Sequence, residues 1–171
     1  MRKNQERLDE LRRCLVLESS AEQAYDDITR LLASSLGVPM VMVSLLDEER
    51  DWFKSAVGTA LHASPASTSF CEAFFHSGES VILAEDTRLD PRFAGHPMVL
   101  GAPNVRFYVA ARLEVNGQTV GTLCAYDVEP RKISADQIAH LKSLAESAMD
   151  LLRRRLPVGA DCARRQVQGR R

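Results

Sequence analysis

The feature that most constrains this chain is a pair of β-rich runs joined by Asn116-Gly117. The runs cover residues 105–115 and 119–126, and both are rich in valine and other strand-forming residues. Asn-Gly favours a two-residue type I′ turn, because both central residues of that turn need a positive φ. We therefore expect an antiparallel hairpin here, with a sheet built around it.

Runs on either side predict the other elements of the domain. Short apolar runs indicate strands, and apolar residues spaced by three and four indicate helices. Capping boxes, in which Ser precedes Glu or Gln by three residues, mark helix starts at Ser20, Ser69 and Ser134. Helices that bracket hairpin-joined strands predict an α+β domain with an antiparallel sheet. The predicted strands are 39–46, 51–57, 80–84, 105–115 and 119–126, the predicted helices are 2–17, 20–36, 69–76 and 134–155, and the predicted loops are 58–68 and 95–104.

The length of 171 residues suits one domain with short extensions. We divide the chain into an N-terminal amphipathic helix over 1–19, a globular domain over 20–155 and a basic, disordered tail over 156–171. The first helix carries one narrow apolar stripe, and the C-terminal helix carries a longer one. Such stripes can bury each other between two copies, so we predict a homodimer through the terminal helices. The stripe of the first helix consists of Leu8, Leu11 and Leu15.

Charge is distributed unevenly along the chain. Residues 153–171 hold seven Arg and one Asp, so the rest is acidic although the whole chain has a formal net charge of −1. An acidic body is a poor surface for DNA or RNA. The sequence also lacks an apolar run long enough to cross a membrane and the apolar core of a signal peptide. We expect a cytoplasmic protein with neither nucleic acid nor a membrane as its partner.

The four cysteines do not form a recognisable framework. They stand at positions 14, 71, 124 and 162, without a Cys-x-x-Cys pair. This spacing predicts neither a disulfide scaffold nor a zinc site. Cys71 opens a predicted helix, where the helix dipole lowers a thiol pKa, so it is either a reactive thiol or a small packed side chain.

Four signatures in a fixed order resemble the GAF domain. The resemblance is closest to the bacterial sensor type found beside cyclase, phosphodiesterase or kinase output domains, and it covers residues 20–155. No single signature is specific, but the ordered set over one domain length is. The signatures are Trp52-Phe53-Lys54-Ser55 with Gly58; Ser69-Phe70-Cys71; Asp86 with Asp90-Pro91-Arg92-Phe93-Ala94; and Arg106-Phe107-Tyr108 with Gly121-Thr122-Leu123-Cys124 and Asp127.

The resemblance implies a central antiparallel sheet of about six strands. The N- and C-terminal helices would pack on one face, and loops and short helices would form a small-molecule pocket on the other. It implies a sensor that passes a signal to a protein effector. The Asn-Lys-Phe-Asp-Glu set of cyclic-nucleotide-binding relatives and the Cys-His pair of bilin-binding relatives are both absent from this sequence, and no cofactor is indicated.

The candidate ligand-binding residues combine aromatic rings with a few polar groups, as small-molecule sites do. Asp86 either accepts hydrogen bonds from the ligand or caps its own loop. Arg92 and Arg106 either clamp an anionic ligand or pair with Asp86 and Asp90. The rings belong either to the pocket or to the core. The candidates are Phe53, Phe70, Cys71, Asp86, Arg92, Phe93, Phe107 and Tyr108.

These observations predict a non-catalytic GAF sensor that binds a small molecule. One alternative is a small thiol-dependent redox enzyme related to free methionine sulfoxide reductase, which would use Cys71 and a second thiol. The other is a structural dimerisation module without a ligand. We expect neither catalytic residues nor a metal site.

Overall fold

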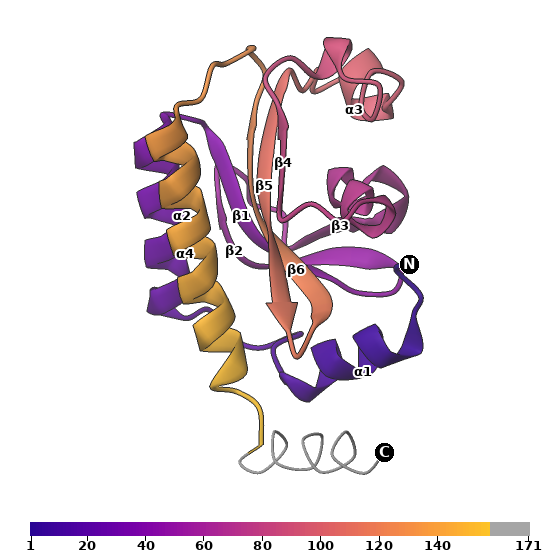
Figure 1. Ribbon diagram of the computed structural model, residues 1–171, viewed down its shortest axis with the longest axis vertical. Coiled ribbons are helices and arrows are strands. Elements are labelled where there is room, and N and C mark those ends of the chain that lie inside the picture. The colour runs from indigo at the N-terminus through magenta and orange to yellow at the C-terminus, as the bar shows by residue number, and fades with distance from the viewer. Residues whose placement is uncertain (158–171) are drawn as a thin grey trace.

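The computed structural model describes residues 1–157 and contains a six-stranded antiparallel sheet (Figure 1). The strand order is β3-β2-β1-β6-β5-β4, so β1 and β6 lie at the centre. This confirms the predicted fold class. The tail predicted from residue 156 lies, from residue 158 on, outside the described residues, as does Cys162. The strands are β1 (Met40–Leu46), β2 (Arg50–Val57), β3 (Ala63–Pro65), β4 (Val81–Ala84), β5 (Phe107–Val115) and β6 (Gln118–Asp127).

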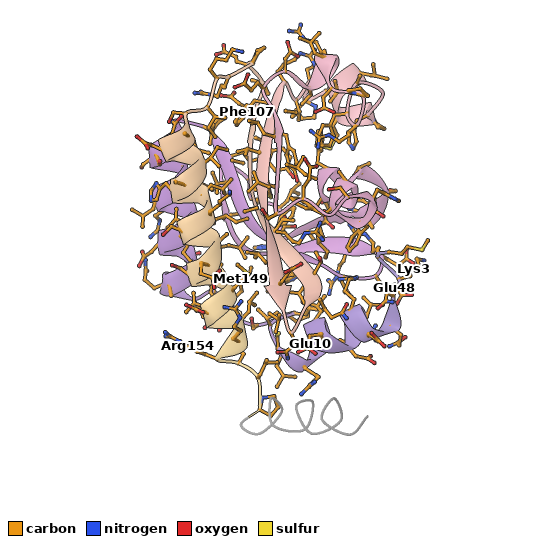
Figure 2. All side chains as sticks on the ribbon, in the orientation of Figure 1. Lys3, Glu10, Glu48, Phe107, Met149 and Arg154 are labelled. Carbon is orange, nitrogen blue, oxygen red and sulfur yellow. The ribbon has the colours of Figure 1, made fainter. Side chains whose placement is uncertain are left out.

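The hairpin predicted at Asn116-Gly117 is confirmed. The two residues have φ angles of 49° and 75°, and Val115 pairs with Gln118 across the turn. The Asn116 side chain also donates from Nδ2 to Glu10 Oε1 at 2.7 Å. Glu10 lies on the first helix, beside the tip of the hairpin (Figure 2). The turn thus joins two strands and anchors a helix.

Two long helices, α2 (Gln23–Leu36) and α4 (Ala135–Arg153), lie together on one face of the sheet (Figure 1). The first helix, α1 (Gln5–Arg13), lies instead at the end of the sheet near the β5–β6 turn. None of the helices within residues 1–157 is long and apolar enough to cross a membrane. The short elements lie on the opposite side of the sheet from α2 and α4: η1 (Ala66–Thr68), η2 (Phe70–His76), η3 (Thr87–Leu89) and α3 (Pro97–Leu100).

The sheet separates two hydrophobic cores, because successive side chains of a strand point to opposite faces. The helix-side core lies under α2 and α4 and includes Leu11, Val43 and Leu141. The second core lies under the short helices and loops and includes Met42 and Phe70. Any small-molecule site that adjoins the loops must therefore use the residues of the second face.

Two of the three residues in the stripe predicted for a dimer contact on the first helix are already buried within the chain. Leu8 and Leu11 are 2% and 0% exposed, whereas Leu15 is 73% exposed. Leu11 joins the helix-side core, so this helix completes the domain. The prediction that Leu8 and Leu11 are free for a partner is therefore wrong, because the chain itself buries them, and Leu15 is the member of the stripe that stays exposed.

Of the three predicted capping boxes, the structure contains the one at Ser134 and lacks those at Ser20 and Ser69. Ser134 and Gln137 form the predicted capping box. The box at Ser20 is wrong: α2 begins at Gln23, and Glu22 precedes it without a side-chain cap. Ser69 does not cap η2, because its hydroxyl bonds across the fold. The predicted loops contain β3 and α3, which are too short to give a periodic signal.

Candidate functional site

A cavity of about 280 Å³ lies between the second face of the sheet and the segments 59–70 and 98–105. Strands β1, β2 and β6 supply its floor, and the loops around η1, α3 and the 103–105 segment cover it. Its wall is mainly apolar, as small-molecule sites are. The volume is at the lower end of the range of about 300–1,000 Å³ that such sites span. The lining residues are Met40, Met42, Asp51, Phe53, Thr59, Leu61, Ser64, Thr68, Ser69, Phe70, Met98, Pro103, Val105 and Tyr126.

Asp51 is the charged residue among those that line this cavity. It is only 3% exposed, and its Oδ1 lies 2.8 Å from Nη2 of Arg2, while its Oδ2 accepts a hydrogen bond from Ser69 Oγ. Burial raises the pKa of the Asp51 carboxyl, and the Arg2 guanidinium opposes that rise. The cavity therefore has one polar corner, where a paired carboxylate meets a hydroxyl.

Aromatic rings form the wall of the cavity next to η2. The Phe70 ring lies 5.2 Å from Phe93, 5.2 Å from Tyr108 and 5.6 Å from Tyr126, measured between centroids. The His96 ring lies closer to Phe70, at 4.1 Å. Phe70 and Tyr126 reach the cavity, whereas Phe93 and Tyr108 support them from behind. Interlocked rings of this kind give the site a preformed shape.

Phe107 lies on the other face of the sheet, which corrects its predicted place at the pocket. It is buried in the helix-side core, whereas the neighbouring Tyr108 is buried in the second core. Figure 2 labels Phe107 on β5, at the end of the strand near the 128–134 loop. The two residues are adjacent in a strand, so they cannot both face one cavity.

Cys71 does not line the cavity either. Its side chain is fully buried, and its Sγ lies 3.1 Å from Thr122 Oγ1 and accepts a hydrogen bond from Tyr108 Oη at 3.4 Å. Hydrogen bonding to Cys124 lowers the pKa of Cys71, and burial opposes this. Cys124 is buried as well and hydrogen-bonds to Met42 O at 3.6 Å. The thiols of Cys71 on η2 and Cys124 on β6 are thus both buried, where solutes do not reach them.

Asp86 and Arg92 lie on two other, more open grooves and do not line this cavity. The Asp86 carboxylate accepts from the backbone N–H of Arg88 and pairs with its guanidinium at 2.7 Å, so it caps η3. Arg92 pairs with Asp90 at 2.7 Å and donates to Leu83 O at 3.1 Å. In this structure both side chains therefore hold loops in place. Asp86 caps its own loop, and Arg92 pairs with Asp90.

The signature at 52–55 serves the helix side more than the cavity. Lys54 is 4% exposed and donates to Ser19 Oγ at 2.7 Å and to Ser20 O at 2.6 Å. Ser55 donates to Asp26 Oδ1 at 2.6 Å and thereby ties β2 to α2. Phe53 is the member of this signature that lines the cavity.

Several lining residues were not predicted from the sequence. Asp51, Met42 and Tyr126 are the most informative, because they come from three neighbouring strands of one face. Strand alternation from Phe53 marks Asp51 as a residue of the same face. Met42 and Tyr126 could not be predicted in this way. Their place at the cavity depends on how β1 pairs with β6, in which Met40 lies opposite Tyr126 and Met42 opposite Cys124.

Comparison with known proteins decides the family. The model of the GAF domain matches residues 20–151. The chain belongs to the GAF domain family. A cyclic di-GMP phosphodiesterase of Pseudomonas aeruginosa is 35% identical to this GAF domain over 136 residues, which make up 78% of this chain and 23% of that relative. The chain thus spans about a quarter of the length of that relative.

Solved structures share the fold. The GAF domain of an Acinetobacter phosphoenolpyruvate-protein phosphotransferase has a TM-score of 0.63 and 18% identity, over 87% of this chain and 93% of that one. The type II free methionine-R-sulfoxide reductase of Thermoplasma acidophilum has a TM-score of 0.61 and 14% identity, over 78% and 95%. The GAF domain of PixJ from Thermosynechococcus elongatus, in its blue-light absorbing form, has a TM-score of 0.60 and 16% identity, over 95% of both chains. At these identities the likeness extends to the fold alone.

Proposed function

We propose that this GAF domain is a non-catalytic regulatory module that binds a small, mainly apolar molecule in the cavity bounded by Met42, Phe53, Phe70 and Tyr126. The observation that carries the proposal is the cavity itself. It is partly enclosed, apolar over most of its wall, and polar at one corner formed by Asp51 and Ser69. Such a site binds through burial of apolar area and selects through a few placed polar groups.

The cavity is connected to segments that can transmit a change. The segments 59–70 and 98–105 cover it, and they consist of short elements joined by loops, of which β3 pairs with β2 at the edge of the sheet. A ligand that contacts these segments stabilises one of their arrangements and shifts the population toward it. We propose that a protein effector reads that arrangement in the cytoplasm.

We propose that the effector belongs to cyclic-dinucleotide signalling. The support is the similarity to a cyclic di-GMP phosphodiesterase, of which the matching segment is a minor part. The domain would then regulate such an enzyme without performing the hydrolysis.

The redox alternative has less support. It needs a thiol that a substrate can reach, and Cys14, Cys71 and Cys124 are all fully buried. Within residues 1–157, no cysteine lines the cavity.

The homodimer stays a prediction, and we now assign it to α4. Leu8 and Leu11 of the first stripe are covered by their own chain, so the outer surface of α4, with half-buried Ile138 and Leu151, is the main remaining part of the predicted contact. Sedimentation equilibrium tests it: a dimer supports the assignment, and a monomer at micromolar concentration contradicts it.

Native mass spectrometry of protein purified from cells tests the proposed function. Ser64 lines the cavity, so Ser64→Phe should fill it, whereas His62→Phe places the same ring on an exposed neighbour. We expect a non-covalent adduct on the wild type and on His62→Phe that is absent from Ser64→Phe. An adduct of equal abundance on all three proteins would place the ligand elsewhere.

A further inference from the structure

The Arg2 side chain is buried, and it binds the carboxylate of Asp51, which lies 49 residues later in the sequence. It is 6% exposed, and its guanidinium contacts Asp51 Oδ1 and Glu72 Oε2, each at 2.8 Å. It also donates to Asp47 O at 2.8 Å and lies 5.5 Å from the centroid of the Phe75 ring. Residues 1–4, which we call the strap, are held against the domain by this side chain.

Asp51 has two sides. One oxygen faces Arg2, and the other accepts from Ser69, which lines the cavity together with Asp51 itself. Arg2 does not line the cavity, so it lies behind the carboxylate as seen from the cavity. A group inside the cavity and the strap outside it therefore share one buried anion.

We propose that Asp51 binds either Arg2 or a cationic group of the ligand, so that a small aryl- or alkyl-ammonium ligand displaces Arg2 and releases the strap. This inference rests on the proposed function, since it concerns the same cavity. It names the ligand class, an organic cation with an apolar body, and it names the segment that reports binding.

The exchange is balanced in charge. A buried carboxylate that loses its partner is strongly unfavourable, but here an ammonium replaces a guanidinium and Asp51 stays paired. The released Arg2 lies beside Glu72, whose side chain is 40% exposed, so the guanidinium can enter water without crossing the core. The apolar wall of the cavity then supplies the burial energy that favours the ligand over the strap.

Release of the strap affects the start of α1. Arg7 is 3% exposed, and its Nε donates to Arg2 O at 2.9 Å. Its Nη1 separately donates to Leu46 O at 2.7 Å, which keeps the rest of the helix on the domain. We therefore expect the first turn of α1 to open while Leu8 and Leu11 stay packed.

The test uses two probes that differ in charge, 2-phenylethylamine and 2-phenylethanol. Affinity is measured by NMR titration, and release is measured by hydrogen exchange of the amides of residues 2–8. The amine should bind more tightly than the alcohol and should accelerate exchange in this segment, whereas the alcohol should not. Asp51→Asn should abolish the preference for the amine.

Variants of the strap supply the controls. Arg2→Ala removes the competitor and should tighten binding of the amine by about tenfold, since the binding-competent state is then fully populated. Lys3→Ala removes the exposed ion pair of the strap with Glu49, which contributes little, and should change the affinity far less than Arg2→Ala does. If Arg2→Ala does not fold, the wild-type exchange measurement and Asp51→Asn still decide the matter.

The outcomes separate the two proposals. If both probes bind equally and neither changes exchange in residues 2–8, the cavity binds small molecules and the strap inference is overturned. If the amine binds without faster exchange, the release of the strap is overturned. If neither probe binds, both the strap inference and the proposed function fail.

Discussion

Phe107 and Tyr108 are consecutive residues of β5 whose side chains enter opposite cores of the domain. The Phe107 ring packs on the face covered by α2 and α4, and the Tyr108 ring packs behind Phe70 on the face of the cavity. The sheet thus separates residues that hold the helices from residues that shape the site.

Phe107→Leu should cost about 1–2 kcal/mol of unfolding free energy, because it leaves a small void in the helix-side core. It should leave the affinity of the cavity for 2-phenylethanol within a factor of two. Urea unfolding and NMR titration measure the two effects. Loss of probe binding in a folded Phe107→Leu protein would place this ring at the site after all.

Gly121→Ala should destabilise the sheet strongly. A Cβ at this position would lie 2.4 Å from Ser44 O in the neighbouring strand β1, so β1 and β6 would have to move apart. We expect a loss of about 3 kcal/mol or more, at the upper end of overpacking effects. Gly78→Ala is the control, because no atom lies within 4 Å of its added Cβ. Equal stability of the two variants would contradict the close strand approach.

Glu22→Gln tests the ion pairs of Glu22 with Lys54, at 2.5 Å, and with Arg155, at 3.1 Å. The hydrogen bond from Lys54 lowers the pKa of Glu22, so the pairs stabilise the fold above the ordinary glutamate pKa of about 4.3 and are lost as the pH falls through the lower, folded-state value. The Glu22 side chain is 41% exposed, so we expect a loss of only about 0.5–1 kcal/mol at pH 7. Urea unfolding at pH 7 and at pH 3.5 should show this difference shrinking, and a constant difference would exclude the pairs as its cause.

Native-state alkylation tests the redox alternative. Cys14, Cys71 and Cys124 should resist iodoacetamide at pH 7.5 and react only after unfolding in guanidinium, because all three are fully buried. Burial also raises the pKa of Cys14 to about 11. Peptide mass spectrometry distinguishes the sites. Rapid labelling of Cys71 in the folded protein would favour a thiol enzyme over a sensor.

The fold was largely predictable because its signals are local. The Asn116-Gly117 turn, the capping box at Ser134 and the apolar run of β1 each specify their own element. The site was less predictable because it depends on which face each residue occupies. Phe53 and Phe70 line the cavity, but Asp86 bonds within its own loop, and Arg92 bonds to Asp90 of its loop and to Leu83 O of β4.

Contacts between residues that are far apart in the sequence could not be predicted from it. Asp51 was not a candidate, since nothing near it in sequence indicates that Arg2 and Ser69 meet its carboxylate. The burial of Leu8 and Leu11 was unpredictable for the same reason. Their spacing indicated an apolar face of the helix but not which surface covers it. Register and helix placement decide both cases.

An NMR titration with 2-phenylethanol, comparing the wild type with Ser64→Phe and His62→Phe, tests directly whether this cavity is the ligand site. We predict that the probe shifts resonances of Met42, Phe53, Phe70 and Tyr126 in the wild type and in His62→Phe, and that Ser64→Phe abolishes these shifts. Shifts centred on Phe107 or α4, or no shifts in any of the three proteins, would contradict the claim that this cavity is the ligand site.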